Sequence, residues 1–258
     1  MSEEAAAFLR ARRSPLELVI FDCDGVLIDS EYLCNRVVAD ILTEAGWPMT
    51  ADECERLFIG MSFYTMQPII ESRLGRPLGA TWVDAVVAVV TEVMAREVEP
   101  MDGGREALDA MTHLALRWRV ASNSSHVEMA AKFGRCGWSD LVAGRLHSAV
   151  DVIAKGGAGK PAPDVFLAAA AAENVSPAHC IVIEDSVHGA TAARAAGMDC
   201  LGLVPRGDGA ALRAAGAVPF RSMHDLPGLL RAAPRPPGVL AGDQDQRSPA
   251  NDRGTPGA

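Results

Sequence analysis

The sequence predicts an α/β fold in which a doubly wound parallel sheet forms the core and carries an inserted all-α domain. Three observations lead to this prediction. The apolar run Leu16–Phe21 has the length and composition of a buried strand. The chain from Ser30 to about Val98 then has a helical pattern, and after Pro100 strand-like and helix-like segments alternate with short turns. Such alternation is typical of a parallel sheet covered by helices on both faces.

The individual elements follow from hydrophobic patterns and from the glycines and prolines that interrupt them. The inserted block is predicted as four helices, Glu31–Ala45, Ala51–Phe58, Phe63–Leu74 and Trp82–Arg96. Pro68 lies inside the third, where a kink or a later start would accommodate it. Beyond the block, helices are predicted at Gly104–Leu116, His126–Cys136, Asp164–Glu173, Val187–Ala196 and Gly209–Ala215, and strands at Trp118–Ala121, Leu141–Leu146, Cys180–Ile183 and Cys200–Val204.

These patterns divide the chain into four parts. Residues 1–14 are expected to form a short N-terminal arm, residues 15–29 and 99–232 the α/β core, and residues 30–98 the helical domain. The tail, residues 233–258, has nine Pro or Gly in 26 residues and little apolar material to bury, so we expect it to be disordered.

Composition excludes several classes of protein. Of the 258 residues 49% are hydrophobic and 22% charged, and the net charge of -9 argues against nucleic acid or an anionic membrane as a partner. No apolar run reaches the roughly 18 residues of a membrane span, and the first residues lack the order of a secretory signal. The six cysteines form no C-x-x-C pair, which favours reduced thiols and a cytoplasmic location. We expect a monomer or weak homo-oligomer acting on a small molecule.

Polar residues follow the predicted strands at the points where the strands end. Asp22 and Asp24 follow the first strand, Ser122 and Asn123 another, and Glu184-Asp185 a third, while Lys160 precedes a helix. Since ligands bind beyond the carboxyl ends of parallel strands, we expect these side chains to share one site.

The residue types in this site suit phosphoryl transfer. The carboxylates of Asp22, Asp24, Glu184 and Asp185 would repel one another, and such hard oxygen ligands suit Mg²⁺. A lysine, a hydroxyl and backbone N–H groups can hold a phosphoryl group. One aspartate can then attack phosphorus, and the other can move the proton.

Four segments, FDCDGVLIDSE, VASNSS, GKPAPDVF and IVIEDSVHGATAARAAGM, resemble the four motifs of the haloacid dehalogenase superfamily. The resemblance covers roughly residues 16–230 and is to the phosphatase and phosphomutase branch with a helical cap after the first strand. It implies that Asp22 is the phosphorylated nucleophile and Asp24 the general acid and base, whose backbone carbonyl also binds Mg²⁺. It further implies that Ser122, Asn123 and Lys160 bind phosphate. It also implies that Asp185 is a direct metal ligand and that Glu184 binds the metal directly or through water.

Within this branch the sequence favours a phosphatase. Haloalkanoic acid dehalogenases lack the second aspartate, which is present here as Asp24. β-Phosphoglucomutases resemble the chain, but two of their residues are replaced. Their G-x-S-R cap loop reads Gly60-Met61-Ser62-Phe63 here, with Phe63 in place of the arginine, and Cys34 stands where they have a histidine. A mutase needs a second phosphate clamp, which Phe63 cannot supply. The cap segment is most similar to sugar phosphatases of the 6-phosphogluconate phosphatase type.

The prediction is therefore a Mg²⁺-dependent phosphatase of small sugar or polyol phosphates that forms an aspartyl-phosphate. A sugar phosphomutase remains the alternative, and a non-enzymatic binding protein is a third reading. Ser30, Glu31, Phe63 and His126 are candidates for the substrate pocket, although the last two also suit structural roles.

Overall fold

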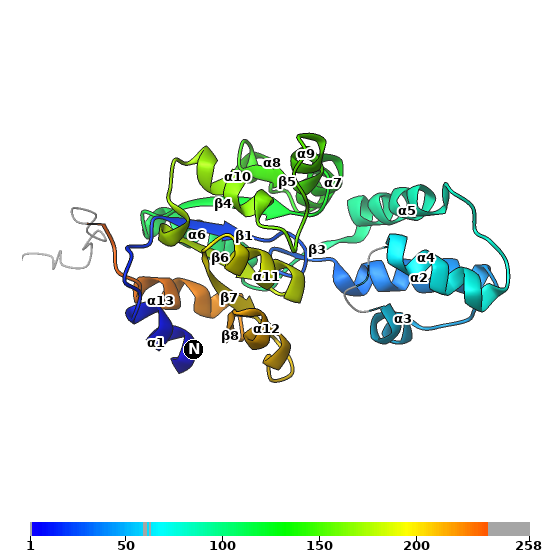
Figure 1. The fold of residues 1–258 in the computed structure, drawn as a ribbon, viewed down its shortest axis with the longest axis horizontal. Coiled ribbons are helices and arrows are strands. Elements are labelled where there is room, and N and C mark those ends of the chain that lie inside the picture. Colours follow the sequence, from blue (N-terminus) through cyan, green and yellow to red (C-terminus); the bar gives the residue numbers. More distant parts are fainter. Residues whose placement is uncertain (1, 59–60, 62, 237–258) are drawn as a thin grey trace, which may run out of the picture.

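The computed structural model describes residues 2–58, 61 and 63–236 of the chain. At its centre lies a six-stranded parallel sheet with the strand order β5-β4-β1-β6-β7-β8 (Figure 1). The strands are β1 (Leu18–Phe21), β4 (Arg117–Ser122), β5 (Leu146–Ser148), β6 (Cys180–Glu184), β7 (Asp199–Leu203) and β8 (Val218–Phe220). The predicted doubly wound parallel sheet is confirmed.

Helices cover both faces of this sheet. The helices of the core are α1 (Glu3–Arg10), α6 (Gly104–His113), α7 (His126–Arg135), α8 (Ser139–Val142), α9 (Ala149–Ala154), α10 (Asp164–Ala172), α11 (Val187–Ala195), α12 (Ala210–Ala215) and α13 (Leu226–Arg231), with 3-10 turns η1 (Pro177–His179) and η2 (Met223–Asp225). One buried cluster joins the sheet to α1, α6, α7 and α13, and a second joins it to α10, α11 and α12. Successive residues of β1 alternate between the two: Val19 and Phe21 belong to the first cluster, Leu18 and Ile20 to the second.

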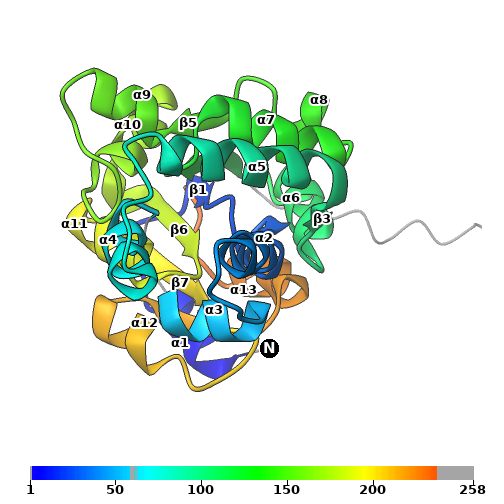
Figure 2. The same ribbon diagram turned by 90° about the vertical axis from the view of Figure 1, so that its right-hand side faces the viewer.

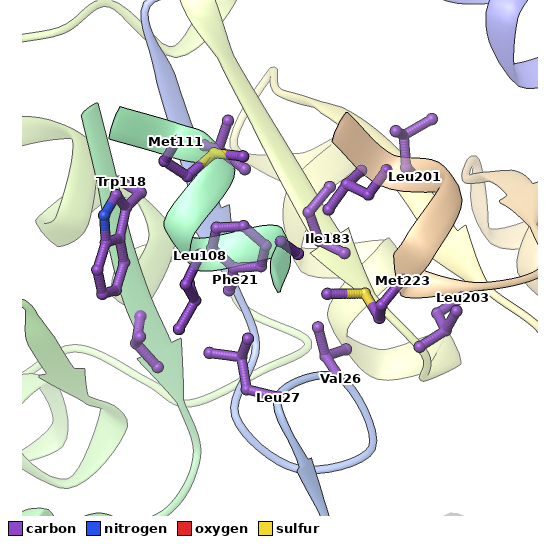
Figure 3. Packing of buried hydrophobic residues seen from close by; sticks show 14 of the residues in the cluster. Phe21, Val26, Leu27, Leu108, Met111, Trp118, Ile183, Leu201, Leu203 and Met223 are labelled. Carbon is purple, nitrogen blue, oxygen red and sulfur yellow. The ribbon is translucent and has the colours of Figure 1, made fainter. Parts of the chain in front are cut away.

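The loop after β1 is anchored in the first cluster. Val26 and Leu27 are fully buried there, in the same cluster as Phe21 (Figure 3). The ring of Phe21 meets that of Trp118 edge to face at a centroid distance of 6.3 Å. The backbone N–H groups of Leu27 and Ile28 both donate to the carbonyl of Cys23. The two aspartates therefore lie in a tight loop whose far side is held by apolar packing.

Two sequence predictions for the core are wrong. Leu141–Leu146 is not a strand, because α8 occupies its first residues, Gly144 adopts a positive φ of 69°, and the strand begins only at Leu146. Residues 1–14 do not stand apart as an arm. Ala5, Ala6 and Leu9 of α1 are buried in the first cluster, so α1 packs as part of the core.

The inserted block consists of four helices, α2 (Glu31–Glu44), α3 (Ala51–Phe58), α4 (Phe63–Leu74) and α5 (Trp82–Glu97). It has a buried cluster of its own, which includes Leu42, Phe58 and Ile70. Helix α4 continues through Pro68. The block lies beyond the end of the sheet in Figure 1, and α2–α5 lie in front of the core in Figure 2.

Two short strands join the block to the core. Strand β2 (Ile28–Asp29) leads into α2 and β3 (Glu99–Pro100) leads out of α5, and the two pair antiparallel. The chain therefore enters and leaves the helical block through one two-stranded connection.

The last described residues remain against the core, since the carbonyl of Pro234 accepts a hydrogen bond from the backbone of Leu16 at 2.8 Å. The rest of the predicted disordered tail, residues 237–258, lies outside the described residues, as do Gly60 and Ser62 of the cap loop. None of the helices that the structure describes is long and apolar enough to cross a membrane.

Candidate active site

Strand register brings the predicted site residues to one edge of the sheet. Phe21 of β1 is in register with Val120 of β4 and with Ile183 of β6. Asp22 follows directly and lies level with Glu184, its backbone N–H donating to the carbonyl of Ile183 at 2.9 Å. Distant segments thus converge because parallel strands end at the same edge.

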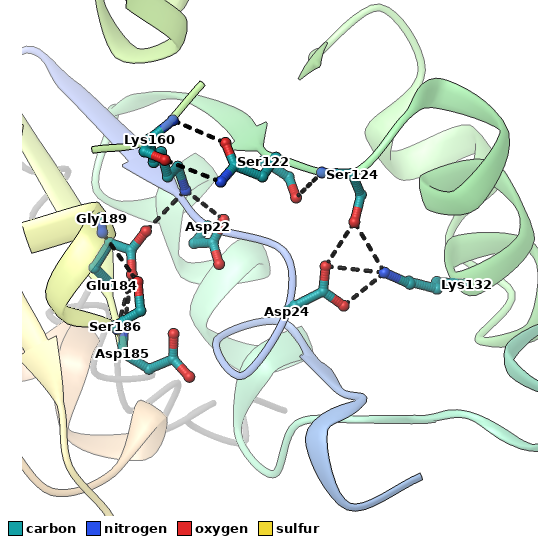
Figure 4. A network of polar contacts seen from close by, with 11 residues as sticks. Asp22, Asp24, Ser122, Ser124, Lys132, Lys160, Glu184, Asp185, Ser186 and Gly189 are labelled. Carbon is teal, nitrogen blue, oxygen red and sulfur yellow. Dashed lines mark hydrogen bonds and ion pairs between the residues drawn. The ribbon is translucent and has the colours of Figure 1, made fainter. Parts of the chain in front are cut away.

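A buried lysine links two of the carboxylates. Lys160 Nζ lies 2.6 Å from Asp22 Oδ1 and 2.8 Å from Glu184 Oε1 (Figure 4). The side chains of Lys160 and Glu184 are 4% and 0% exposed, so water does not screen this interaction. Burial opposes the charge of Lys160, but the two carboxylates outweigh it and raise its pKa.

Glu184 is held from both sides. Its Oε2 accepts hydrogen bonds from the backbone N–H of Asp185 at 3.0 Å and from the N–H and hydroxyl of Ser186, both at 2.9 Å. Ser186 also caps α11, its hydroxyl accepting from Gly189 N–H at 3.0 Å. A Cβ at Gly189 would lie 1.6 Å from Glu184 Oε1, so only glycine leaves room for the carboxylate at this position.

The acidic group fits a divalent cation. Oxygens of Asp22, Glu184 and Asp185 all lie within 4.8 Å of one another. Burial raises the pKa of Asp185 well above its usual value, and Glu184 and Asp22 raise it further. Burial also raises the pKa of Asp22, although Lys160 opposes this shift. Three carboxylates facing one lysine leave a surplus of negative charge, and carboxylate oxygens are ligands that Mg²⁺ prefers.

Asp24 lies in a separate group with its own lysine. Lys132 Nζ is 2.6 Å from Asp24 Oδ1 and 2.9 Å from Oδ2. The hydroxyl of Ser30 donates to Oδ1 at 2.5 Å, and that of Ser124 donates to Oδ2 at 3.0 Å. Burial opposes ionisation of Asp24, but Lys132 and the two hydroxyls outweigh it and lower its pKa. In Figure 4 the Asp24 carboxylate points toward Lys132 and away from Lys160.

The end of β4 and the loop after it contact both groups. Ser122 is buried, and its hydroxyl accepts a hydrogen bond from the backbone of Ser124 at 3.0 Å. Asn123 Oδ1 accepts from the backbone N–H of Lys160 at 2.9 Å. The predicted phosphate-binding residues Ser122, Asn123 and Lys160 are thus part of one connected set, and their role stays a prediction.

The predicted substrate residues have different surroundings. Ser30 is buried against Asp24, and Glu31 is exposed at the start of α2. Phe63 packs against the buried cluster of the helical block. His126 pairs with Asp151 at 2.8 Å and lines an apolar pocket together with Phe133 and Val142. Phe63 and His126 thus make packing and surface contacts. Among the hydrogen bonds of the described residues, Ser30 is the one of these four candidates that contacts an aspartate of the site.

Sequence reasoning missed Lys132 and Ser124. Ser124 lies in the quoted VASNSS motif, whereas Lys132 lies inside a helix pattern with no motif around it. A signal was present in the composition, because the chain has only three lysines among its 24 basic residues. Two of the three, Lys132 and Lys160, are buried beside the aspartates.

The fold and the site define an α/β enzyme with an acidic cluster and two buried lysines at the carboxyl edge of its sheet. The model of the haloacid dehalogenase-like hydrolases matches residues 16–197. The chain belongs to this family, and the prediction of a phosphatase-type enzyme agrees with its relatives.

Among curated relatives, the 6-phosphogluconate phosphatase of Escherichia coli (strain K12) is 32% identical over 187 residues, which cover 72% of this chain and 81% of that protein. A haloacid dehalogenase-like protein of unknown function from Agrobacterium tumefaciens has a similar structure, with 36% identity and a TM-score of 0.74 over 84% of this chain and 98% of the other. A hydrolase of this family from Deinococcus radiodurans, solved with bound phosphate and sodium, has 30% identity and a TM-score of 0.70 over the same shares, 84% and 98%.

Proposed function

We propose that this chain is a Mg²⁺-dependent phosphatase that hydrolyses small sugar or polyol phosphate monoesters through an aspartyl-phosphate. The observation that carries the proposal is the buried contact of Lys160 with Asp22 and Glu184, beside Asp185, at the edge where the sheet ends. A nucleophilic carboxylate, a fixed cation and a set of metal ligands are the parts that phosphoryl transfer needs.

The proposed reaction has two steps. In the first, an oxygen of Asp22 bonds to phosphorus and the bond to the ester oxygen breaks. Asp24, which must first take up a proton although Lys132 lowers its pKa, gives that proton to the leaving alkoxide. In the second, a water oxygen attacks the same phosphorus and passes a proton to Asp24. The bond from phosphorus to Asp22 then breaks and inorganic phosphate leaves.

Lys160, Ser122 and Asn123 would hold the phosphoryl oxygens during both steps. Asp22, Glu184, Asp185 and the backbone carbonyl of Asp24 would hold Mg²⁺, which when bound neutralises charge on the phosphoryl group.

The helical block, residues 30–98, would act as a cap that excludes bulk water and selects the leaving group. The paired strands β2 and β3 form its connection to the core and are the natural hinge. The name of the Escherichia coli relative supports a sugar-acid or sugar phosphate as the substrate class.

The sugar phosphomutase alternative has less support. Cys34 replaces the histidine of that group, and Phe63 packs into the helical block, so neither supplies a clamp for a second phosphate.

A substrate panel tests the proposal directly. The purified chain is incubated with phosphorylated sugars, polyols and nucleotides, either with Mg²⁺ or with EDTA, and released phosphate is measured. We expect phosphate from sugar or polyol phosphates with Mg²⁺, and a loss of turnover of about tenfold or more with EDTA. Release from no substrate would contradict the proposal, and interconversion of glucose phosphates without release would support the mutase instead.

Replacing Gly25 tests the metal ligands. A Cβ at Gly25 would lie 1.8 Å from Asp185 Oδ2, so Gly25→Ala must displace this carboxylate. We expect the Mg²⁺ concentration for half-maximal activity to rise about tenfold. Gly197→Ala is the matched control, because Gly197 has nearly the same φ, 72° against 73°, with no atom within 4 Å of the added Cβ. If Gly197→Ala raises the Mg²⁺ requirement as much as Gly25→Ala does, backbone strain and not the displaced carboxylate would account for the rise.

A further inference from the structure

We propose that Lys132 is a positioning residue for Asp24, holding its carboxylate apart from Asp22 and beside Ser124 in the loop after β4. This inference rests on the proposed function, in which Asp24 donates and accepts the proton. Lys132 belongs to none of the four sequence motifs, and its only polar contacts among the described residues are with Asp24 and Ser124.

The first support is that Lys132 is buried. Its side chain is 8% exposed, although lysine is a residue that proteins almost always leave in water. Desolvating an ammonium group is costly unless it is paired, and a lysine with no role at this position could be replaced by an apolar residue of the same length. The ion pair with Asp24 is therefore the feature that accounts for a lysine here.

The second support is that the backbone fixes where Lys132 points. Ser125 caps α7 through reciprocal hydrogen bonds with Glu128, of 2.7 and 3.2 Å, so the helix starts directly after the short loop that follows β4. Met129 and Phe133 are buried in the core cluster and fix the rotation of α7. Lys132 then lies between them in sequence, on the turn that faces Asp24.

The third support is the pattern of contacts around Asp24. Each carboxylate oxygen receives one hydroxyl and the ammonium group of Lys132. The hydroxyls come from Ser30, at the entry to the helical block, and from Ser124, in the phosphate-binding loop. Asp24 is thus placed between the two parts of the molecule that would meet the substrate.

These contacts also keep the two aspartates apart. Lys160 contacts Asp22 and Lys132 contacts Asp24, so each carboxylate has a separate cation. Without Lys132, the half-buried Asp24 carboxylate would have no cation of its own and would be drawn toward water or toward the cations around Asp22. It would then be misplaced for proton transfer to the leaving oxygen, while the nucleophile and the phosphate cradle would be unchanged.

Leaving-group dependence tests this proposal. 4-Nitrophenyl phosphate releases a stable phenolate that needs no proton, whereas a sugar phosphate releases an alkoxide that does. In Lys132→Met we expect kcat/KM for the fastest sugar phosphate of the panel to fall about 10- to 100-fold, and that for 4-nitrophenyl phosphate to change less than about threefold. Lys132→Arg, which keeps the charge, should recover part of the loss, and Lys155→Met, at an exposed lysine, should behave as the unmodified chain.

Two further variants separate the possible results. Ser124→Ala removes one donor to Asp24 and should show a smaller change with the same substrate preference, which keeps the proposal testable if Lys132→Met does not fold. Equal losses on both substrates, or no loss, in Lys132→Met and Ser124→Ala would overturn the proposal. Asp24→Asn should show the same preference more strongly; if it shows none, the acid-base role of Asp24 in the proposed function fails instead.

Discussion

Replacing Asp22 by asparagine is expected to lower kcat about 10,000-fold or more while leaving the fold intact. The side-chain amide has the size of the carboxylate, and its oxygen can still accept the hydrogen bond that Lys160 makes with Asp22 Oδ1 at 2.6 Å. It cannot act as an anionic nucleophile toward phosphorus. The substituted chain should therefore bind substrate and retain its thermal midpoint but release almost no phosphate.

Two measurements make this prediction specific. Acid quenching during turnover should trap one phosphoryl group on the unmodified chain, and peptide mass spectrometry should find it on Asp22 and on no peptide of Asp22→Asn. Asp140→Asn, at an exposed carboxylate of α8, is the control and should keep full activity. Substantial turnover by Asp22→Asn, or a phosphoryl group on another residue, would contradict the aspartyl-phosphate route.

Most of the fold could be predicted because its signals are local. The strands β1 and β6 are continuous apolar runs, and the helices of the inserted block are separated by glycine and proline. The segments that were missed or wrong depend on tertiary contacts. Helix α1 has only eight residues and is stabilised by burial of Ala5, Ala6 and Leu9, and β5 is three residues long and exists through its pairing with β4.

The candidate site likewise contains residues that local sequence signals predict and a residue that only tertiary structure reveals. Asp22 and Asp185 follow strands and Glu184 ends one, so the rule for parallel sheets places them together without any knowledge of side chains. Lys132 reaches Asp24 across 108 residues of sequence from the middle of a helix, and no strand end marks it. From the sequence, the repulsion among these carboxylates is expected to be offset by Mg²⁺. The structure adds that each aspartate has a lysine of its own, so part of the repulsion is already balanced by the chain.

Replacing Lys160 by methionine is expected to damage both stability and catalysis. Methionine fills the space of the lysine stem but leaves Asp22 and Glu184 buried without the cation that contacts them at 2.6 and 2.8 Å. Breaking a buried ion pair from one side costs about 3–5 kcal/mol of unfolding free energy, which for a chain of this size lowers the thermal midpoint by about 10 °C. Loss of a positive charge at the phosphoryl group should lower kcat about 1,000-fold.

Added Mg²⁺ separates the two effects of Lys160→Met. A divalent cation held by Asp22, Glu184 and Asp185 would compensate the buried charges, so Mg²⁺ should raise the thermal midpoint of this variant more than that of the unmodified chain. It should not restore kcat, because the ammonium group that would contact the phosphoryl oxygens is gone. Lys155→Met controls for loss of a lysine in general. The contrary result would be a Lys160→Met variant that, without metal, is as stable as the unmodified chain. It would mean that the lysine does not balance these carboxylates, because leaving buried charges unpaired must lower the free energy of unfolding.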